Sequence, residues 1–341
     1  MTSTTSDQRP AACRQTSSVC TSGAPAGVKA KKAAFERNPP PVKESVLLTF
    51  KGVDGWDVYN CSIPFTSCGR RYLFGRVERR DQWARSHVSL FEATGVDEWA
   101  KVAGFTDLDL EDPYVQTIGG ELVVGGTFVT RHADGTVKSY LGRFYRGADP
   151  FSLKFFLDGP DRMKDIRLVE FPDGRVGVFT RQRGEDVHAK YGSEAVIGYF
   201  EAPSLDAISA DAIEKAEAID GILGKDEWGG CNQIYLRPDG KLLAAAHLSA
   251  SGEPAANGQV RQIYCNAAFV FDPATRKASH VKIVATRRLY PACEPKVPHL
   301  DDCVFTSGFV FRDDGFVDVY TGVGDARQGR VTLPASVLPG P

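Results

Sequence analysis

From about Val46 onward, the chain alternates short apolar runs with polar turns that contain glycine. Short runs rich in β-branched and aromatic residues, bounded by turn residues, are typical of β-strands. One unit, a glycine-containing turn followed by an apolar strand, recurs five times along the chain. The five units are residues 67–78, 118–128, 172–181, 238–247 and 313–322.

The spacing of these units indicates the architecture. Their turn glycines are Gly69, Gly120, Gly174, Gly240 and Gly315. Neighbouring turn glycines are roughly 50 to 75 residues apart, which is typical of propeller blades with loops of variable length. The pattern therefore predicts an all-β chain folded as a five-bladed β-propeller. A β-sandwich is the alternative, but it offers no reason for one motif to recur at this interval.

Further strand-like segments follow the five units, as the outer strands of blades should. They are residues 87–93, 139–147, 195–203, 266–273 and 278–285. Residues 204–220 have helical spacing and predict a short surface helix. Residues 1–44 are rich in Ser, Thr, Ala, Pro and Lys, and few of them could join a core. We expect a disordered leader over 1–44 and a single propeller domain over 45–341.

Composition excludes several classes of protein. The net charge of −2 leaves no basic excess for nucleic acid, and no apolar run is long enough for a membrane helix. Eight cysteines without an apolar signal segment before them predict reduced thiols and a cytoplasmic location. Because no two cysteines have Cys-x-x-Cys spacing, we expect no metal site, and no feature calls for a cofactor.

Polar residues recur at the ends of the five units, where the inner strands of a propeller converge on its channel. Arginine, lysine, histidine and tyrosine side chains that meet there would bind an anion such as phosphate. Carboxylates and an asparagine at the same mouth would suit sugar hydroxyls. Each residue alone has an ordinary explanation, since an aspartate before proline is common in turns. Their equivalent places in different units favour a shared site for glycosyl transfer to or from phosphate.

Four signatures resemble known enzymes. They are "NCSI…GRVE", "EDP…GG…GT", "KDIRL…GRVGVFTR" and "FTSGFVF…DGFVDVYTGVGDA". Over about residues 46–333, the chain resembles the five-bladed propeller mannoside phosphorylases. It is more closely similar to the related MTP-like glycosyltransferases, the β-1,2-mannosyltransferase/phosphorylase family that turns over a β-1,2-linked mannan reserve.

The resemblance implies a role for each matching residue. Asp112, in the Glu-Asp-Pro motif, would be the catalytic proton donor. The implied phosphate-binding residues are Arg76, Lys164, Arg181, His247 and Tyr320. The implied substrate-binding residues are Asn60, Ser62, Glu111, Asp165, Arg167 and Asp325. The chain departs from the phosphorylases at Tyr114, where they usually have arginine. That anion contact is either missing or supplied by Arg167, which leaves open whether phosphate or a nucleotide sugar is used.

The implied reaction is an inverting single displacement without a metal. Phosphate attacks a terminal mannose of a mannose oligosaccharide and releases mannose 1-phosphate; the reverse reaction extends the glycan, and the transferase branch uses GDP-mannose. One carboxylic acid suffices because phosphate is already charged, whereas an inverting hydrolase needs a second carboxylate about 6.5–9.5 Å away.

Two alternatives stay open. A non-catalytic glycan-binding propeller would not need Asp112 or the cations. A glycoside hydrolase of the arabinanase type would need three carboxylates, for which Asp112, Asp165 and Asp325 are candidates. The cationic residues argue against a hydrolase, because water needs no cationic binding site. Glycan length, linkage and oligomeric state do not follow from the sequence.

Overall fold

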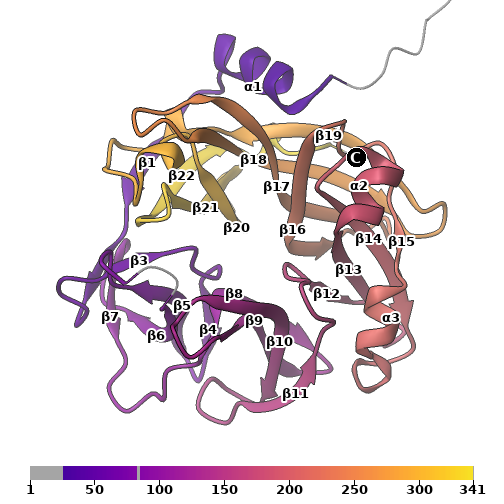
Figure 1. The fold of residues 1–341 in the computed structure, drawn as a ribbon. Coiled ribbons are helices and arrows are strands. Elements are labelled where there is room, and N and C mark those ends of the chain that lie inside the picture. Colours follow the sequence, from indigo (N-terminus) through magenta and orange to yellow (C-terminus); the bar gives the residue numbers. More distant parts are fainter. Residues whose placement is uncertain (1–25, 83–84, 341) are drawn as a thin grey trace, which may run out of the picture.

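The computed structural model describes residues 26–82 and 85–340, and almost all regular structure in them is β-sheet. The sheets stand around a common centre, like the blades of a propeller (Figure 1). Most strands pair antiparallel with strands that follow them in the sequence, so most pairing is local; the exceptions include β1 and β2, which pair with strands far along the chain. The innermost strands of the sheets border this centre (Figure 1).

The strands are grouped as follows. The first sheet contains β2 (Thr49–Lys51), β7 (Glu98–Lys101), β6 (His87–Ala93), β5 (Arg70–Glu78) and β3 (Asp57–Tyr59), with β4 (Phe65–Ser67) on β5. The second contains β8 (Glu111–Ile118), β9 (Glu121–Arg131), β10 (Val137–Gly147) and β11 (Lys154–Asp158). The last contains β20 (Val304–Phe311), β21 (Phe316–Val323), β22 (Arg327–Pro334) and β1 (Glu44–Leu47).

The remaining strands form one continuous sheet with two antiparallel halves. The first half contains β12 (Arg167–Glu170), β13 (Val176–Arg183), β14 (Ala195–Ala202) and β15 (Glu217–Ala218). The second contains β16 (Glu227–Leu236), β17 (Leu242–Pro254), β18 (Val260–Asp272) and β19 (Lys277–Ala285). The halves are joined where Ala195 of β14 pairs in parallel with Trp228 of β16.

Helices are short and lie outside the sheets. They are α1 (Val28–Arg37), α2 (Glu185–Tyr191) and α3 (Ala210–Glu214), with 3₁₀ turns η1 (Leu205–Ala207), η2 (Arg287–Leu289), η3 (Pro298–Leu300) and η4 (Ala335–Val337). The helix expected over 204–220 is therefore broken into η1, α3 and β15. Among the described residues, no helix has the length and apolar character needed to cross a membrane.

The strand predictions from the five units are confirmed. In each sheet or half-sheet, the predicted turn connects the innermost strands and holds its glycine at a positive φ, between 72° at Gly69 and 84° at Gly174. Glycine is favoured there because a side chain is strained in this left-handed conformation. The five further segments expected as outer strands are also strands, namely β6, β10, β14, β18 and β19.

The expected leader requires a correction. Residues 1–25 lie outside the described part of the chain, but residues 28–37 form α1 and are packed on the propeller. Val28 is fully buried in the same core cluster as residues of β17 and β18, and its amide donates to the carboxylate of Glu227. Composition alone misses this contact, because it depends on an acceptor 199 residues away.

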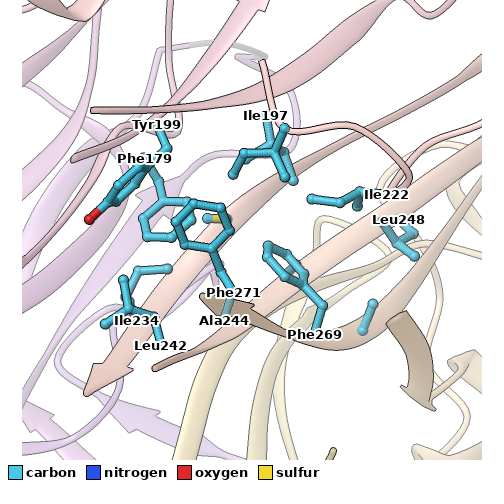
Figure 2. Packing of buried hydrophobic residues seen from close by; sticks show 14 of the residues in the cluster. Phe179, Ile197, Tyr199, Ile222, Ile234, Leu242, Ala244, Leu248, Phe269 and Phe271 are labelled. Carbon is cyan, nitrogen blue, oxygen red and sulfur yellow. The ribbon is translucent and has the colours of Figure 1, made fainter. Parts of the chain in front are cut away.

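The largest core cluster lies between neighbouring strands of the continuous sheet (Figure 2). Tyr199 packs between two phenylalanines, with ring centroids 5.0 Å from Phe179 and 4.6 Å from Phe271. Burying each such side chain contributes about 1.5–3 kcal/mol to folding. In β17, Leu242 and Ala244 face this cluster while Leu243 and Ala245 face a second one, so both faces of the half-sheet are used for packing.

Candidate active site

Four polar residues near the centre share an unusual backbone. Asn60, Asp112, Asp165 and Asp325 all have a positive φ, between 46° and 58°. They lie directly after β3, in β8, before β12 and after β21. Asn and Asp tolerate this conformation better than other side chains, and such strained positions cluster at functional sites. The backbone itself thus marks a site built from four parts of the ring.

Asp112 is the centre of a hydrogen-bonded group. Its Oδ1 accepts from Asn60 Nδ2 at 2.9 Å and from Arg76 Nη1 at 3.0 Å. Its other oxygen, Oδ2, lies 3.9 Å from Lys164 Nζ. The same Asn60 amide nitrogen lies 3.3 Å from Asp325 Oδ1. One amide group therefore bridges two carboxyl groups that are far apart in the sequence.

The two carboxyl groups titrate differently. Burial alone would raise the pKa of Asp112, but Arg76, Lys164 and the Asn60 hydrogen bond outweigh burial and lower this pKa below its ordinary value. Burial raises the pKa of Asp325, and the nearby Asp112 adds to the increase despite Arg76. Asp112 is therefore ionised in the free protein. It can deliver a proton only when a negative charge nearby offsets the positive charges of Arg76 and Lys164 and so raises its pKa.

Arg76 is held in place by neighbouring polar side chains. Its Nη2 donates to Glu78 Oε2 at 2.8 Å, and its Nε donates to Ser86 Oγ at 3.0 Å. Glu78 is fully buried and also accepts from Lys296 and, at 2.7 Å, from the hydroxyl of Tyr59. Because Nε and Nη2 of Arg76 are held by Ser86 and Glu78, its Nη1 is oriented toward Asp112 before any ligand binds.

The other half of the site is built around Asp165. Arg181 Nη1 donates to Asp165 Oδ2 at 2.7 Å, while Arg181 Nε donates to the carbonyl of Gly229 at 2.8 Å. Burial would raise the pKa of Asp165, but Arg181, Lys164 and Arg167 together hold this pKa well below its usual range. The carboxylate therefore stays charged and keeps the cations in place.

Gly230 lets three of these side chains meet. A Cβ placed on Gly230 would lie 3.0 Å from Arg181 Cδ, 3.1 Å from His247 Cε1 and 3.3 Å from Asp165 Cβ. Only a residue without a side chain leaves room for this arrangement. Arg181, His247 and Asp165 are thus neighbours, and Lys164 links them to Asp112.

Lys164 and Glu111 open onto the solvent side of the site. Together with Thr127, Tyr140 and Arg183, they line a cavity of about 160 Å³. Glu111 accepts from Ser86 Oγ at 3.0 Å and lies 3.4 Å from Arg76. The cavity gives a ligand access to a group of side chains that are otherwise buried.

The structure separates two expected residues from the site. Tyr320 belongs to a hydrophobic cluster with Trp99 and Phe91, and its hydroxyl accepts from Arg71 at 3.2 Å. Ser62 uses its hydroxyl locally, donating to the carbonyl of Ile63 and accepting from the amide of Phe74. The expectation that Tyr320 converges with Lys164, Arg181 and His247 is wrong, because its position in β21 directs the ring into the core.

Arg167 is also used differently from the expectation. Its guanidinium donates to the carbonyls of Asn232 and Ile166 and lies over the ring of Tyr114, 4.6 Å from the centroid. Tyr114, which stands where arginine was expected, is itself buried against Phe144. Arg167 therefore supports the strands around the site, and its Nη2 lies 3.6 Å from Asp165 Oδ1.

Two residues of the site were missed by sequence reasoning. Lys296 precedes η3 and bonds to Glu78 and Tyr59. Asn232 lies in β16, where its Oδ1 is 2.9 Å from His247 Nδ1. Neither belongs to a motif that could have indicated it. Within residues 26–82 and 85–340, no group of His, Cys, Asp and Glu side chains could hold a metal ion.

The chain matches known sequences and structures along nearly its whole length. Residues 33–337 match the family described as protein of unknown function DUF1861. A comparison with curated proteins finds no match. The structure of MPT-4, a mannose phosphorylase from Leishmania mexicana, in complex with phosphate ion, has 47% sequence identity and a TM-score of 0.84; the match covers 91% of this chain and 95% of that one.

Two further structures are informative. MPT-1, a GDP-Man-dependent mannosyltransferase from Leishmania mexicana, has 42% identity and a TM-score of 0.83, covering 91% of this chain and 95% of that one. The β-1,2-mannobiose phosphorylase from Listeria innocua has 13% identity and a TM-score of 0.60, covering 83% of this chain and 92% of that one. At that identity, the Listeria enzyme shows a shared fold alone.

Proposed function

The chain belongs to the DUF1861 family and to the family of the Leishmania mannose phosphorylase and mannosyltransferase, and from this membership we propose that it transfers mannosyl groups between mannose oligosaccharides and phosphate. The observation that carries the proposal is a buried carboxyl group, Asp112, next to a group of cations that are already oriented. A phosphorolytic enzyme needs both, a proton donor for the leaving oxygen and a site for the attacking anion.

In the proposed reaction, Lys164, Arg181 and His247 bind phosphate. One phosphate oxygen forms a bond to the anomeric carbon of the terminal mannose while the bond from that carbon to the glycosidic oxygen breaks. Asp112 supplies the proton that the leaving oxygen takes, and Asn60, Glu111 and Asp325 contact sugar hydroxyls. The products are mannose 1-phosphate and a glycan shorter by one residue; the reverse reaction returns the proton to Asp112.

The low pKa of Asp112 is compatible with this role if phosphate binding comes first. A bound anion would offset the positive charge of Lys164 and Arg76, which is what lowers that pKa in the free protein. Asp112 would then take up a proton from solvent before the sugar reacts. The same reasoning applies to the phosphate group of a sugar phosphate or of GDP-mannose, the donor of a mannosyltransferase.

Three finer features belong to the same proposal. We infer five blades, counting the two antiparallel halves of the continuous sheet separately because a single parallel bridge joins them. We assign residues 45–341 to this one catalytic domain, and helix α1 packs on it from the N-terminal side. The β-1,2 linkage of the mannosides rests on the sequence signatures, and a cytoplasmic location rests on the cysteine content.

The test is product analysis with the whole protein. The protein is incubated with a β-1,2-linked mannose oligosaccharide and phosphate, and the anomeric signals are followed by NMR. We expect α-mannose 1-phosphate, which is the inverted product, and glycan extension when mannose 1-phosphate or GDP-mannose is supplied instead. Free mannose without phosphate would indicate a hydrolase, and glycan binding without turnover would indicate a non-catalytic propeller; either result would contradict the proposal.

A further inference from the structure

Asn232 lies at an irregularity of strand β16. The register between β16 and β17 shifts between Cys231 and Gln233, so Asn232 is the extra residue of a β-bulge. A bulge frees one residue from the ladder and changes the direction of its side chain. Here the freed carbonyl of Asn232 accepts from Arg167 Nε, and the side-chain Oδ1 lies 2.9 Å from His247 Nδ1.

This contact determines where the imidazole carries its proton. A carbonyl oxygen can only accept a hydrogen bond, so with Asn232 Oδ1 facing the ring, His247 Nδ1 carries the hydrogen and Nε2 carries a lone pair. The ring is neutral, because burial, assisted by Arg181, lowers the pKa of His247 to about 3. Its Nε2 is buried and has no hydrogen-bond partner among the residues that the structure describes.

The ring cannot turn freely to find another partner. It stacks on Tyr264, with centroids 5.5 Å apart, and packs against Phe305 at 4.9 Å. Its Cε1, the atom next to Nε2, lies against Gly230 together with Arg181 and Asp165. A hydrogen-bond acceptor without a partner thus sits beside side chains that attract anions. An anion placed there satisfies the acceptor only if one of its oxygens carries a hydrogen.

We propose that Asn232 is a positioning residue that makes His247 Nε2 an acceptor, so that the site selects a tetrahedral anion with a hydroxyl group, inorganic phosphate, over anions without one. This inference rests on the proposed function, since it uses the same anion site. Inorganic phosphate carries a hydroxyl at neutral pH, whereas sulfate and the diphosphate of a nucleotide sugar do not. The arrangement therefore favours phosphorolysis over transfer from a nucleotide sugar.

The experiment compares anions of similar size and charge. Dissociation constants of phosphate, sulfate and monofluorophosphate are measured by calorimetry at pH 7.5 and constant ionic strength. We expect the wild-type protein to bind phosphate about 10- to 100-fold more tightly than the other two, the range that corresponds to one unsatisfied buried acceptor. Equal affinities would overturn the inference, because they would mean that the Asn232 amide is reversed and that Nε2 donates.

Variants test whether Asn232 sets the preference. Asn232→Leu removes the partner of Nδ1, and His247→Gln places an amide that can donate or accept; both should bring the ratio of affinities to within about threefold of one. Gln233→Leu is the matched control. Gln233 is the next residue of β16 and is also buried, but its amide donates to the carbonyl of Val115, so the ratio should stay at the wild-type value.

The outcomes separate the two proposals. Anion selectivity without release of mannose 1-phosphate would overturn the proposed function and support the acceptor role of His247. Turnover without selectivity would overturn the acceptor role alone. Melting temperatures identify a variant that fails to fold, and the wild-type comparison of the three anions decides the inference in that case. The inference would also be overturned if Asn232→Leu and His247→Gln both folded and both kept the wild-type ratio of anion affinities.

Discussion

At the position of Asp112, the backbone is left-handed (φ 49°) and the side chain is 4% exposed. Most residue types would be strained in this conformation, and most polar ones would lose hydration without gaining a partner. Aspartate tolerates the conformation and receives hydrogen bonds from Asn60 and Arg76. Such strain at a buried, paired carboxyl group is compatible with selection for chemistry rather than for stability.

Asp112→Asn should abolish turnover and preserve the fold. Asparagine also tolerates a positive φ, and its Oδ1 can still accept from Asn60 and Arg76, but it cannot deliver a proton. Loss of general acid catalysis typically lowers the rate about 10²- to 10⁴-fold. Release of mannose 1-phosphate and the melting temperature are measured for both proteins. Turnover within a few-fold of wild type in a normally folded variant would leave Asp112 with a structural role only.

The constants kcat/KM and kcat should depend on pH in different ways. The pKa of Asp112 is lowered in the free protein, so the protonated fraction, and with it kcat/KM for phosphorolysis, should fall as the pH rises above that low value. Bound phosphate offsets Lys164 and Arg76, so kcat should be retained to higher pH. The measurement is a pair of pH profiles corrected for the second ionisation of phosphate.

A cation variant provides the control for these profiles. Lys164→Met removes one positive charge near Asp112 and should move the fall of kcat/KM to higher pH. Profiles that coincide for kcat and kcat/KM, or a fall of kcat/KM that Lys164→Met leaves in place, would show that Asp112 is not the titrating acid.

At the scale of elements, the site depends on irregular strands. The register shifts between Glu111 and Tyr114 in β8 and between Cys231 and Gln233 in β16. These bulges leave most of each ladder intact but redirect Asp112 and Asn232. A regular strand would direct alternate side chains to its two faces, so it could not aim these residues toward the centre without disturbing the core packing.

Gly230→Ala should weaken phosphate binding. The new Cβ would lie 3.0–3.3 Å from atoms of Arg181, His247 and Asp165, so these side chains must move by a few tenths of an ångström. We expect KM for phosphate to rise roughly tenfold, with an overpacking cost of about 1–3 kcal/mol in unfolding free energy. Kinetics at varied phosphate and urea denaturation measure the two effects.

Gly174→Ala is the control at this scale. Gly174 lies in a hairpin turn with φ 84° and open space around its Cα. Alanine there should lower the unfolding free energy by about 1 kcal/mol, because of backbone strain, and leave KM unchanged. If both variants changed KM equally, the effect of Gly230→Ala would reflect general loosening and not the geometry of the anion site.

At the scale of the whole molecule, the two ends of the described chain close the ring. β1 pairs with β22 in the last sheet, and β2, which follows it, pairs with β7 in the first sheet. Helix α1 then packs on the outside, with Val28 in the core cluster and its amide bonded to Glu227, a neighbour of the strand residues that border the site. Residues 28–37 are thus packed on the propeller.

Val28→Ala should destabilise the protein. The substitution removes two buried methyl groups from the core. Together with the cavity that remains, this loss corresponds to about 2 kcal/mol of unfolding free energy. Lys29→Ala, at the exposed neighbouring position, should change it by less than about 0.5 kcal/mol. Urea denaturation compares the three proteins. Equal midpoints for Val28→Ala and wild type would mean that α1 is detached in solution.

The features that the sequence predicted are those with local causes. Alternating apolar residues and turn glycines such as Gly120 and Gly240 determine strands and hairpins within about ten residues, and these were confirmed. The order of the motifs also placed Asp112, Arg76 and Lys164 near one another and Arg181 beside Asp165, because each lies in or next to the innermost strands of its sheet.

Only the tertiary structure determines the contacts between residues that are far apart in the sequence. The direction of Tyr320 follows from the register of β21 and from the neighbouring sheet, which turn its ring into the core. Asn232 and Lys296 gain their partners only when the ring closes, and no local pattern marks them. Val28 lies in a polar, alanine-rich segment but is buried, because its side chain packs in the core cluster and Glu227 accepts the hydrogen bond of its amide. Backbone periodicity acts over a few residues, whereas these contacts arise from the meeting of sheets that are far apart in the chain.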